Sequence, residues 1–113
     1  MGEFNRIRVI ETGSISAGSH KDYEQAEEVD LVLKRIFIVE TGGNSMNNVV
    51  LTLYVGDKPY FKPNASAAIF DPSNPLNPEL NIEVAKGVKV SGRVTNNESA
   101  ARSLLIHLVY EEA

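Results

Sequence analysis

The residues best suited to nucleophilic or acid–base chemistry stand together in the segment Ser19-His20-Lys21-Asp22. Serine, histidine and aspartate form the hydrolytic triad, whose side chains must converge with a defined geometry. Three near neighbours on one segment cannot readily converge in that way, so we assign His20 no catalytic role. The other histidine, His107, has no second base or metal ligand beside it in the sequence, and we expect it to form a cross-strand hydrogen bond.

Metal and cofactor chemistry finds little support in the sequence. Acidic residues gather between Asp22 and Asp30, but their spacing differs from that of a calcium loop and favours a solvated charge run. The chain has no cysteine, which excludes disulfides, thiolate catalysis and cysteine-based zinc sites. A phosphate loop, a paired-histidine metal motif and a nucleophile elbow are also missing. We predict a protein that is not an enzyme and that has no cofactor and no metal site.

The charge balance argues against a nucleic-acid role. Eleven Lys and Arg stand against fifteen Asp and Glu, for a net charge of −4, and the basic residues form no block. No apolar stretch approaches the roughly 18 residues of a membrane span, and the first residues lack the apolar core of a signal peptide. We therefore expect no direct contact with nucleic acid or membrane, and a chain that stays in the compartment where it is made.

The elements that must position these side chains are strands. A chain of 113 residues is expected to form a single domain, residues 1–113. Apolar residues alternate with period two, and we expect strands over 4–12, 29–40, 47–55, 67–70, 80–84, 88–95 and 102–111. About seven or eight strands without a useful amphipathic helix predict an all-β, antiparallel two-sheet sandwich of the jelly-roll kind.

The same alternation assigns side chains to faces. In 4–12 it separates Ile7 and Val9 from Arg6, Arg8 and Ile10, and we expect the arginines on the solvent side. In 29–40 it places Leu31, Leu33, Phe37 and Val39 on one face and Val32, Ile36 and Ile38 on the other. In 47–55 it predicts that Val49, Leu51, Leu53 and Val55 point inward. In 102–111 it separates Leu104, Ile106, Leu108 and Tyr110 from Ser103, Leu105, His107 and Val109.

Two further expectations concern the connections. Residues 13–25 are rich in glycine, serine and charge, so we interpret them as a loop with room for one short, irregular strand, and residues 1–25 as an arm that orders on assembly. The last three strands, 80–84, 88–95 and 102–111, are predicted to form an antiparallel meander because their connections are short.

The proline-rich segment 61–78 is the predicted contact region. Within it, the prolines of 71–78 forbid helix and strand pairing, so we expect an extended surface loop that is stiff enough for a fixed intermolecular contact. We also expect that shortening 71–78 leaves the stability of the core nearly unchanged. Gly92 stands within a strand and indicates a bulge or a close approach by another chain. The candidate interface residues are therefore Phe61, Phe70, Pro75, Leu76 and Gly92.

The aromatic residues near this segment allow a different interpretation. Tyr54, Tyr60, Phe61 and Phe70 flank it and could form a platform for sugars, although the chain has no tryptophan. A carbohydrate-binding module is thus the alternative to an assembling protein.

Three stretches carry a resemblance to a known group of proteins. They are Val49-Val-Leu-Thr-Leu-Tyr-Val-Gly-Asp-Lys-Pro-Tyr60, the segment 83–96 and the closing Leu-Leu-Ile-His-Leu-Val-Tyr-Glu-Glu. Their pattern, over residues 48–112, resembles small jelly-roll structural proteins of viruses and bacteriophages and contains no diagnostic motif. The resemblance implies a capsid, decoration or tail component of a virion, made in the host cytoplasm, that assembles with copies of itself and other virion proteins. It carries over no catalytic residue. A small hydrolase or isomerase on the same sandwich is the more distant alternative.

Overall fold

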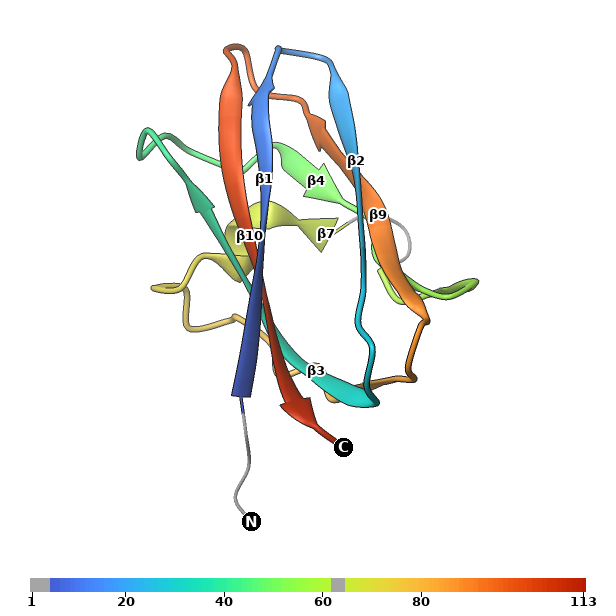
Figure 1. Ribbon diagram of the computed structural model, residues 1–113. Coiled ribbons are helices and arrows are strands. Elements are labelled where there is room, and N and C mark those ends of the chain that lie inside the picture. Colours follow the sequence, from blue (N-terminus) through green and yellow to red (C-terminus); the bar gives the residue numbers. More distant parts are fainter. Residues whose placement is uncertain (1–4, 62–64) are drawn as a thin grey trace.

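Two antiparallel β-sheets pack face to face in the computed structural model, which describes residues 5–61 and 65–113 (Figure 1). The elements in chain order are β1 (Asn5–Ile15), β2 (His20–Ala26), β3 (Leu31–Glu40), β4 (Val49–Leu51), β5 (Tyr54–Val55), β6 (Lys58–Pro59), β7 (Ala65–Ser66), the 3-10 helix η1 (Ala67–Phe70), β8 (Ile82–Val84), β9 (Lys89–Asn96) and β10 (Arg102–Glu112). In these described residues η1 is the only helix, as the period-two alternation predicts.

The strand order is that of a jelly roll. Sheet A contains β1, β10, β3 and β8 in that order. In sheet B, β9 pairs with β2 on one side and with β4 and β5 on the other, while the short β7 and β6 pair with β4 and β5. Along the chain β1, β3, β8 and β10 belong to sheet A, whereas β2, β4 to β7 and β9 belong to sheet B. This repeated crossing between two sheets gives the jelly-roll connectivity and confirms the predicted fold class.

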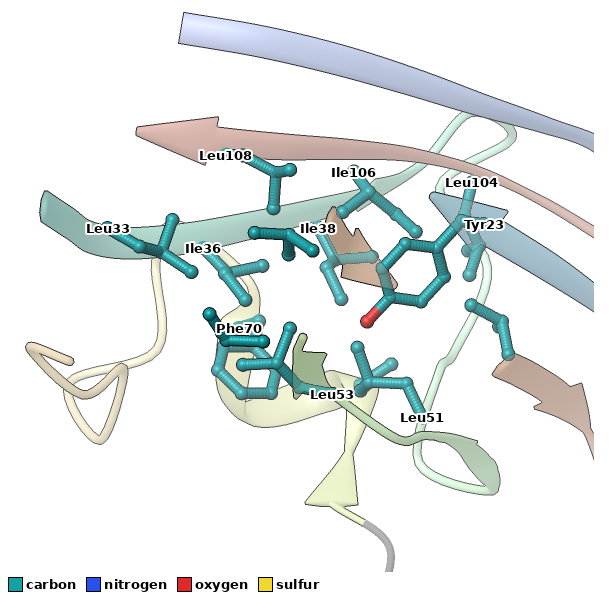
Figure 2. Close-up of a cluster of buried hydrophobic side chains, with 14 of the residues drawn as sticks. Tyr23, Leu33, Ile36, Ile38, Leu51, Leu53, Phe70, Leu104, Ile106 and Leu108 are labelled. Atoms are coloured by element: carbon teal, nitrogen blue, oxygen red, sulfur yellow. The ribbon is translucent and has the colours of Figure 1, made fainter. Parts of the chain in front are cut away.

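The core lies between the inner faces of the two sheets, where leucine and isoleucine side chains from β3, β4 and β10 meet the ring of Phe70 (Figure 2). The inward residues predicted for 47–55 are all buried, and so is one of the two faces separated in 102–111: Val49, Leu51, Leu53, Val55, Leu104, Ile106, Leu108 and Tyr110. Each such side chain contributes about 1.5–3 kcal/mol through burial, so the alternating strands hold the sandwich together.

The predicted meander of the last three strands is wrong. β8 pairs with β3, β10 pairs with β1 and β3, and β9 lies in the other sheet. The short connections 85–88 and 97–101 therefore cross from one sheet to the other instead of closing hairpins. Period-two alternation identifies the buried face of a strand but says nothing of its neighbours, and the prediction failed for that reason.

Residues 13–25 are mainly strand and not mainly loop, because β1 extends to Ile15 and β2 pairs with β9 from His20 to Ala26. The short, irregular strand allowed in this segment is a regular strand of seven residues. In β2 only Tyr23 is buried, and the other side chains point to solvent or the sandwich edge, which gives the strand its polar composition. Residues 5–15 and 20–26 are thus strands of the sandwich and not an arm; residues 1–4 lie outside the described residues.

The predicted strand 67–70 is the helix η1 instead. Ser66 caps its start, since the hydroxyl oxygen accepts a hydrogen bond from the Ala68 amide, and the Asp71 amide donates to the Ala68 carbonyl at its end. A serine cap competes with strand pairing, and that local competition outweighs the apolar alternation.

A β-bulge interrupts β3. In its pairing with β10, Val109 faces Arg35 whereas the next residue, Tyr110, faces Leu33, so Lys34 is the extra residue. An extra residue shifts the alternation by one position, and every later side chain changes faces.

The bulge moves two large apolar side chains to the outside. Before it the odd-numbered residues are buried and after it the even-numbered ones are: Leu31, Leu33, Ile36, Ile38 and Glu40. Phe37 and Val39 therefore lie on the outer face of sheet A, which corrects the prediction that they share the face of Leu31 and Leu33.

Candidate interaction surfaces

The predicted interface residues do not form one surface. Leu76, which is 74% exposed, and Pro75 lie together on the loop that follows η1. Phe70 is fully buried in the core, so its prediction as an intermolecular anchor is wrong. The Phe61 ring is half-buried and lies 5.2 Å from the Phe70 ring, centroid to centroid, so it packs mainly within its own chain. Sequence reasoning failed for Phe70 because η1 turns this residue inward from a loop that is otherwise at the surface.

The loop over residues 71–78 is compact and attached to β3, not extended. The Asp71 carboxylate accepts hydrogen bonds from the amide and hydroxyl of Ser73, and this holds the pKa of Asp71 below its usual range. The Asn77 side-chain amide donates to the Ile36 carbonyl, and Arg35 donates to the Asn77 carbonyl. The loop therefore covers the edge of β3 beyond its short pairing with β8, so we now expect its loss to destabilise the core.

Gly92 faces a side chain of its own chain, not a second chain. The register between β2 and β9 runs without a shift and places Tyr23 directly opposite Gly92. The Tyr23 hydroxyl reaches past the glycine and donates to the Thr52 carbonyl at 2.6 Å. A Cβ atom at Gly92 would lie 2.0 Å from that carbonyl oxygen. The predicted close approach exists, but it is intramolecular and there is no bulge at this residue.

Apolar side chains cover the outer face of sheet A, and we call this group the apolar face. It surrounds the imidazole of His107 and consists of Ile7, Val9, Phe37, Val39, Leu105 and Val109. Ile7 and Val9 are 59% and 51% exposed. A hollow of about 310 Å³ opens on this face and is lined by Ile7, Phe37, Val39, Pro72, His107 and Val109.

The arginines of β1 lie on the opposite side of the strand from the apolar face. Arg8 reaches toward the connection between β2 and β3, where its guanidinium donates to both carboxylate oxygens of Glu27, at 2.7 and 3.1 Å. The Glu27 side chain is only 3% exposed. Arg8 is exposed, as expected, and Arg6 is half-buried, but the other side of this strand is also exposed because it carries Ile7 and Val9.

His107 makes the predicted cross-strand hydrogen bond. Its Nδ1 atom lies 3.2 Å from the carbonyl oxygen of Phe37 on β3 and donates to it. The bond occupies one ring nitrogen and fixes the imidazole in the middle of the apolar face.

A polar groove of about 510 Å³ lies on the outer face of sheet B, lined by Asp22, Tyr23, Glu24, Thr52, Tyr54, Ser91, Gly92 and Arg93. Arg93 donates to both carboxylate oxygens of Asp22, and this hydrogen bonding lowers the pKa of Asp22. Tyr54 is 40% exposed and supplies the one exposed aromatic ring of the groove lining.

The four aromatic residues proposed as a sugar platform are separated in space. Tyr60 and Phe61 line a different hollow beside residues 79–83, and Phe70 is in the core. Only Tyr54 borders the polar groove, so these rings do not present one continuous stacking surface.

Glu40 is a buried carboxylate at the end of β3. It accepts hydrogen bonds from the amides of Gly42, Asn44 and Ser103. Burial by itself raises the pKa of Glu40, but these hydrogen bonds outweigh burial and hold the pKa below its ordinary value. The carboxylate thereby ties the turn after β3 to β10, which is a structural role.

Within residues 5–61 and 65–113, no group of three histidine, aspartate or glutamate side chains gathers as a metal ion would require. The same residues form no helix that is long and apolar enough to cross a membrane. Ser19 and His20 are exposed, and the Asp22 carboxylate is bound by Arg93.

We compared the chain with known proteins, and the comparison gives no functional assignment. No family model matches the chain. A search of curated proteins finds no significant match either.

Proposed function

We propose that the chain is a non-enzymatic structural protein of a virion, acting as a capsid, decoration or tail component that assembles in many copies. The observation that carries this proposal is the apolar face. A soluble domain rarely leaves a contiguous apolar area exposed unless another molecule covers it. Here Ile7 and Val9 extend into solvent beside the half-buried Phe37, Leu105 and Val109, although a period-two strand could carry polar side chains at the same positions.

The jelly-roll connectivity is compatible with this function without specifying it. Viral capsid proteins and lectins share the fold, so the function must come from the surfaces. An assembly protein needs surfaces that bury apolar area against a neighbour, and the apolar face offers one on a rigid sheet.

Two measurements test the proposal: self-association of the purified chain, and the protein composition of virus particles. We expect sedimentation velocity to show association that increases with concentration and that Val9→Asp weakens. Val29→Asp is the matched control, because Val29 is exposed in the turn between β2 and β3 and not on the apolar face. Mass spectrometry should find the chain in virus particles purified from cells that carry the gene. A chain that stays monomeric and is absent from such particles would contradict the proposal.

Carbohydrate binding is the second candidate, and the polar groove favours it. The exposed Tyr54 ring beside hydrogen-bonding groups such as Asp22 and Arg93 is the combination that sugar recognition uses. Depletion assays with insoluble polysaccharides would detect it, and Tyr54→Ala should then abolish binding. We rank it second because Asp22 and Arg93 already pair with each other.

A further inference from the structure

The outer faces of β1, β10 and β3 form a regular grid of nine side chains. The first row is Ile7, Val109 and Arg35, the second is Val9, His107 and Phe37, and the third is Glu11, Leu105 and Val39. Within each row the side chains are directly paired across neighbouring strands, so all nine share one face. Seven of the positions are apolar or imidazole, and the two charged residues occupy opposite corners.

The charged corners have opposite signs. Glu11 lies on β1 in the third row, and Arg35 lies on β3 in the first row. Glu11 is exposed and has no ion-pair partner among the described residues. Arg35 uses one guanidinium nitrogen for the Asn77 carbonyl, at 3.3 Å, and forms no ion pair within those residues either.

We propose that a second copy of this chain covers the apolar face, with the two copies related by a twofold axis that runs in the plane of the sheet through Ile7 and Val39. This inference rests on the proposed function and specifies its first contact. This axis is one diagonal of the grid, and rotation about it exchanges the two corners that lie off it. Glu11 of each copy therefore meets Arg35 of the other. A twofold axis makes the contact self-complementary and produces two identical ion pairs at its rim.

The apolar positions match under the same operation. Leu105 of one copy lies over Phe37 of the other, next to the hollow beside Phe37, and Val9 lies over Val109. Ile7, His107 and Val39 each meet their own counterpart. The grid measures about 9.6 Å across the strands and about 13.6 Å along them, so the axis makes about 35° with the strands. The strands of the two copies therefore cross at about 70°, closer to the orthogonal than to the aligned arrangement of two β-sheets packed face to face. An axis along the strands would place neither charge opposite its complement.

The size of the face predicts a weak contact. Three strands about 4.8 Å apart and five residues of about 3.4 Å each cover roughly 15 by 17 Å. A stable dimer usually buries about 800 Å² per partner, so this face alone falls short. We expect association that depends on concentration and becomes strong only where several contacts act together in an assembly.

Charge reversal tests the orientation. Glu11→Arg and Arg35→Glu should each weaken self-association at least about fivefold, because each places like charges at both rim positions. A mixture of the two variants, and the double variant alone, should recover association near that of the unchanged chain, since both rim pairs are again opposite in charge. Thermal melts check that Arg35→Glu, which loses the bond to Asn77, remains folded.

A cross-linking experiment tests the same contact without changing Arg35. The chain has no cysteine, so a single introduced thiol can link only to its counterpart. Sheets packed face to face lie about 10 Å apart, which is too far for a direct disulfide but within reach of a short bis-maleimide. This reagent should link two copies of Ile7→Cys because Ile7 lies on the axis, whereas Val29→Cys, off the face, should not give a linked dimer.

The outcomes separate this inference from the proposed function. The twofold contact is overturned if charge reversal does not weaken self-association and Ile7→Cys gives no linked dimer. The proposed assembly role is not affected by that result. Loss of particle incorporation in Val9→Asp without any self-association would show a different protein on the face and also overturn the twofold contact. A strictly monomeric chain that is absent from particles overturns both.

Discussion

Replacing Gly92 with alanine should strongly destabilise the sandwich, because β9 is the central strand of sheet B and has no room for a methyl group here. The added Cβ would lie 2.0 Å from the Thr52 carbonyl oxygen and 2.6 Å from the Tyr23 hydroxyl. Ordinary contact begins at 3.4 Å, so the separation from Thr52 would have to grow by about 1.4 Å. The first obstacle is a backbone atom, which cannot move aside as a side chain can.

The magnitude follows from two costs. Overpacking a well-packed interior destabilises by about 1–3 kcal/mol. Displacing β9 also breaks the hydrogen bond from Tyr23 to Thr52, which costs about 0.5–1.5 kcal/mol. The sum is about 1.5–4.5 kcal/mol, which lowers the melting temperature by roughly 6–18 °C for a domain of this size.

Urea unfolding followed by circular dichroism measures this change. Tyr23→Phe removes only the hydroxyl and should cost about 1 kcal/mol, which isolates the hydrogen bond from the steric effect. Gly42→Ala is the comparison variant, because its close contacts are side-chain atoms, the Asn44 amide at 2.8 Å and the Glu40 carboxylate at 3.2 Å, and not backbone. It should therefore cost less than Gly92→Ala. A Gly92→Ala variant that loses less than about 1 kcal/mol, or one that Tyr23→Phe restores fully, would refute the reasoning.

Three further predictions follow from buried charges and the loop. Glu40→Gln should cost about 1–3 kcal/mol at pH 7. Because the folded pKa of Glu40 lies below its ordinary value of 4.5, its contribution is complete above that pH and is lost as the pH falls, so the urea midpoints of the two proteins should converge toward pH 3. Arg8→Ala should lower the melting temperature by leaving the buried Glu27 carboxylate without its cation, and adding Glu27→Gln should recover part of the loss. Leu76→Asp should leave the melting temperature nearly unchanged while lowering particle incorporation. Replacing 71–78 with a short Gly-Ser linker should instead lower the melting temperature.

Each of these predictions has an outcome that contradicts it. A difference between Glu40→Gln and the unchanged chain that stays constant from pH 7 to pH 3 would mean that the carboxylate charge does not matter. If Glu27→Gln makes Arg8→Ala less stable still, the loss comes from packing and not from an unpaired charge. Normal incorporation of Leu76→Asp would exclude the loop tip as a contact, and an unchanged melting temperature in the shortened chain would show that the loop does not support β3.

Local chemistry was sufficient for much of the fold. The alternation in 47–55 and 102–111 predicted the buried side chains there, because successive side chains of a strand point to opposite faces whatever the strand pairs with. The cross-strand bond of His107 was likewise predictable from its place on a strand. The polar strand β2 was missed because its outer face is solvated and Tyr23 is its only buried residue.

The sequence by itself determined that this chain is an antiparallel two-sheet β-protein, because period-two alternation and proline placement act through the local backbone. Only the tertiary structure decided which strands are neighbours and where the bulge in β3 lies, since both depend on pairing between distant segments. The bulge at Lys34 turns Phe37 and Val39 outward to join Ile7 and Val109. The apolar face therefore exists because of one extra residue in one strand, whose effect appears only when β3 is paired with β10.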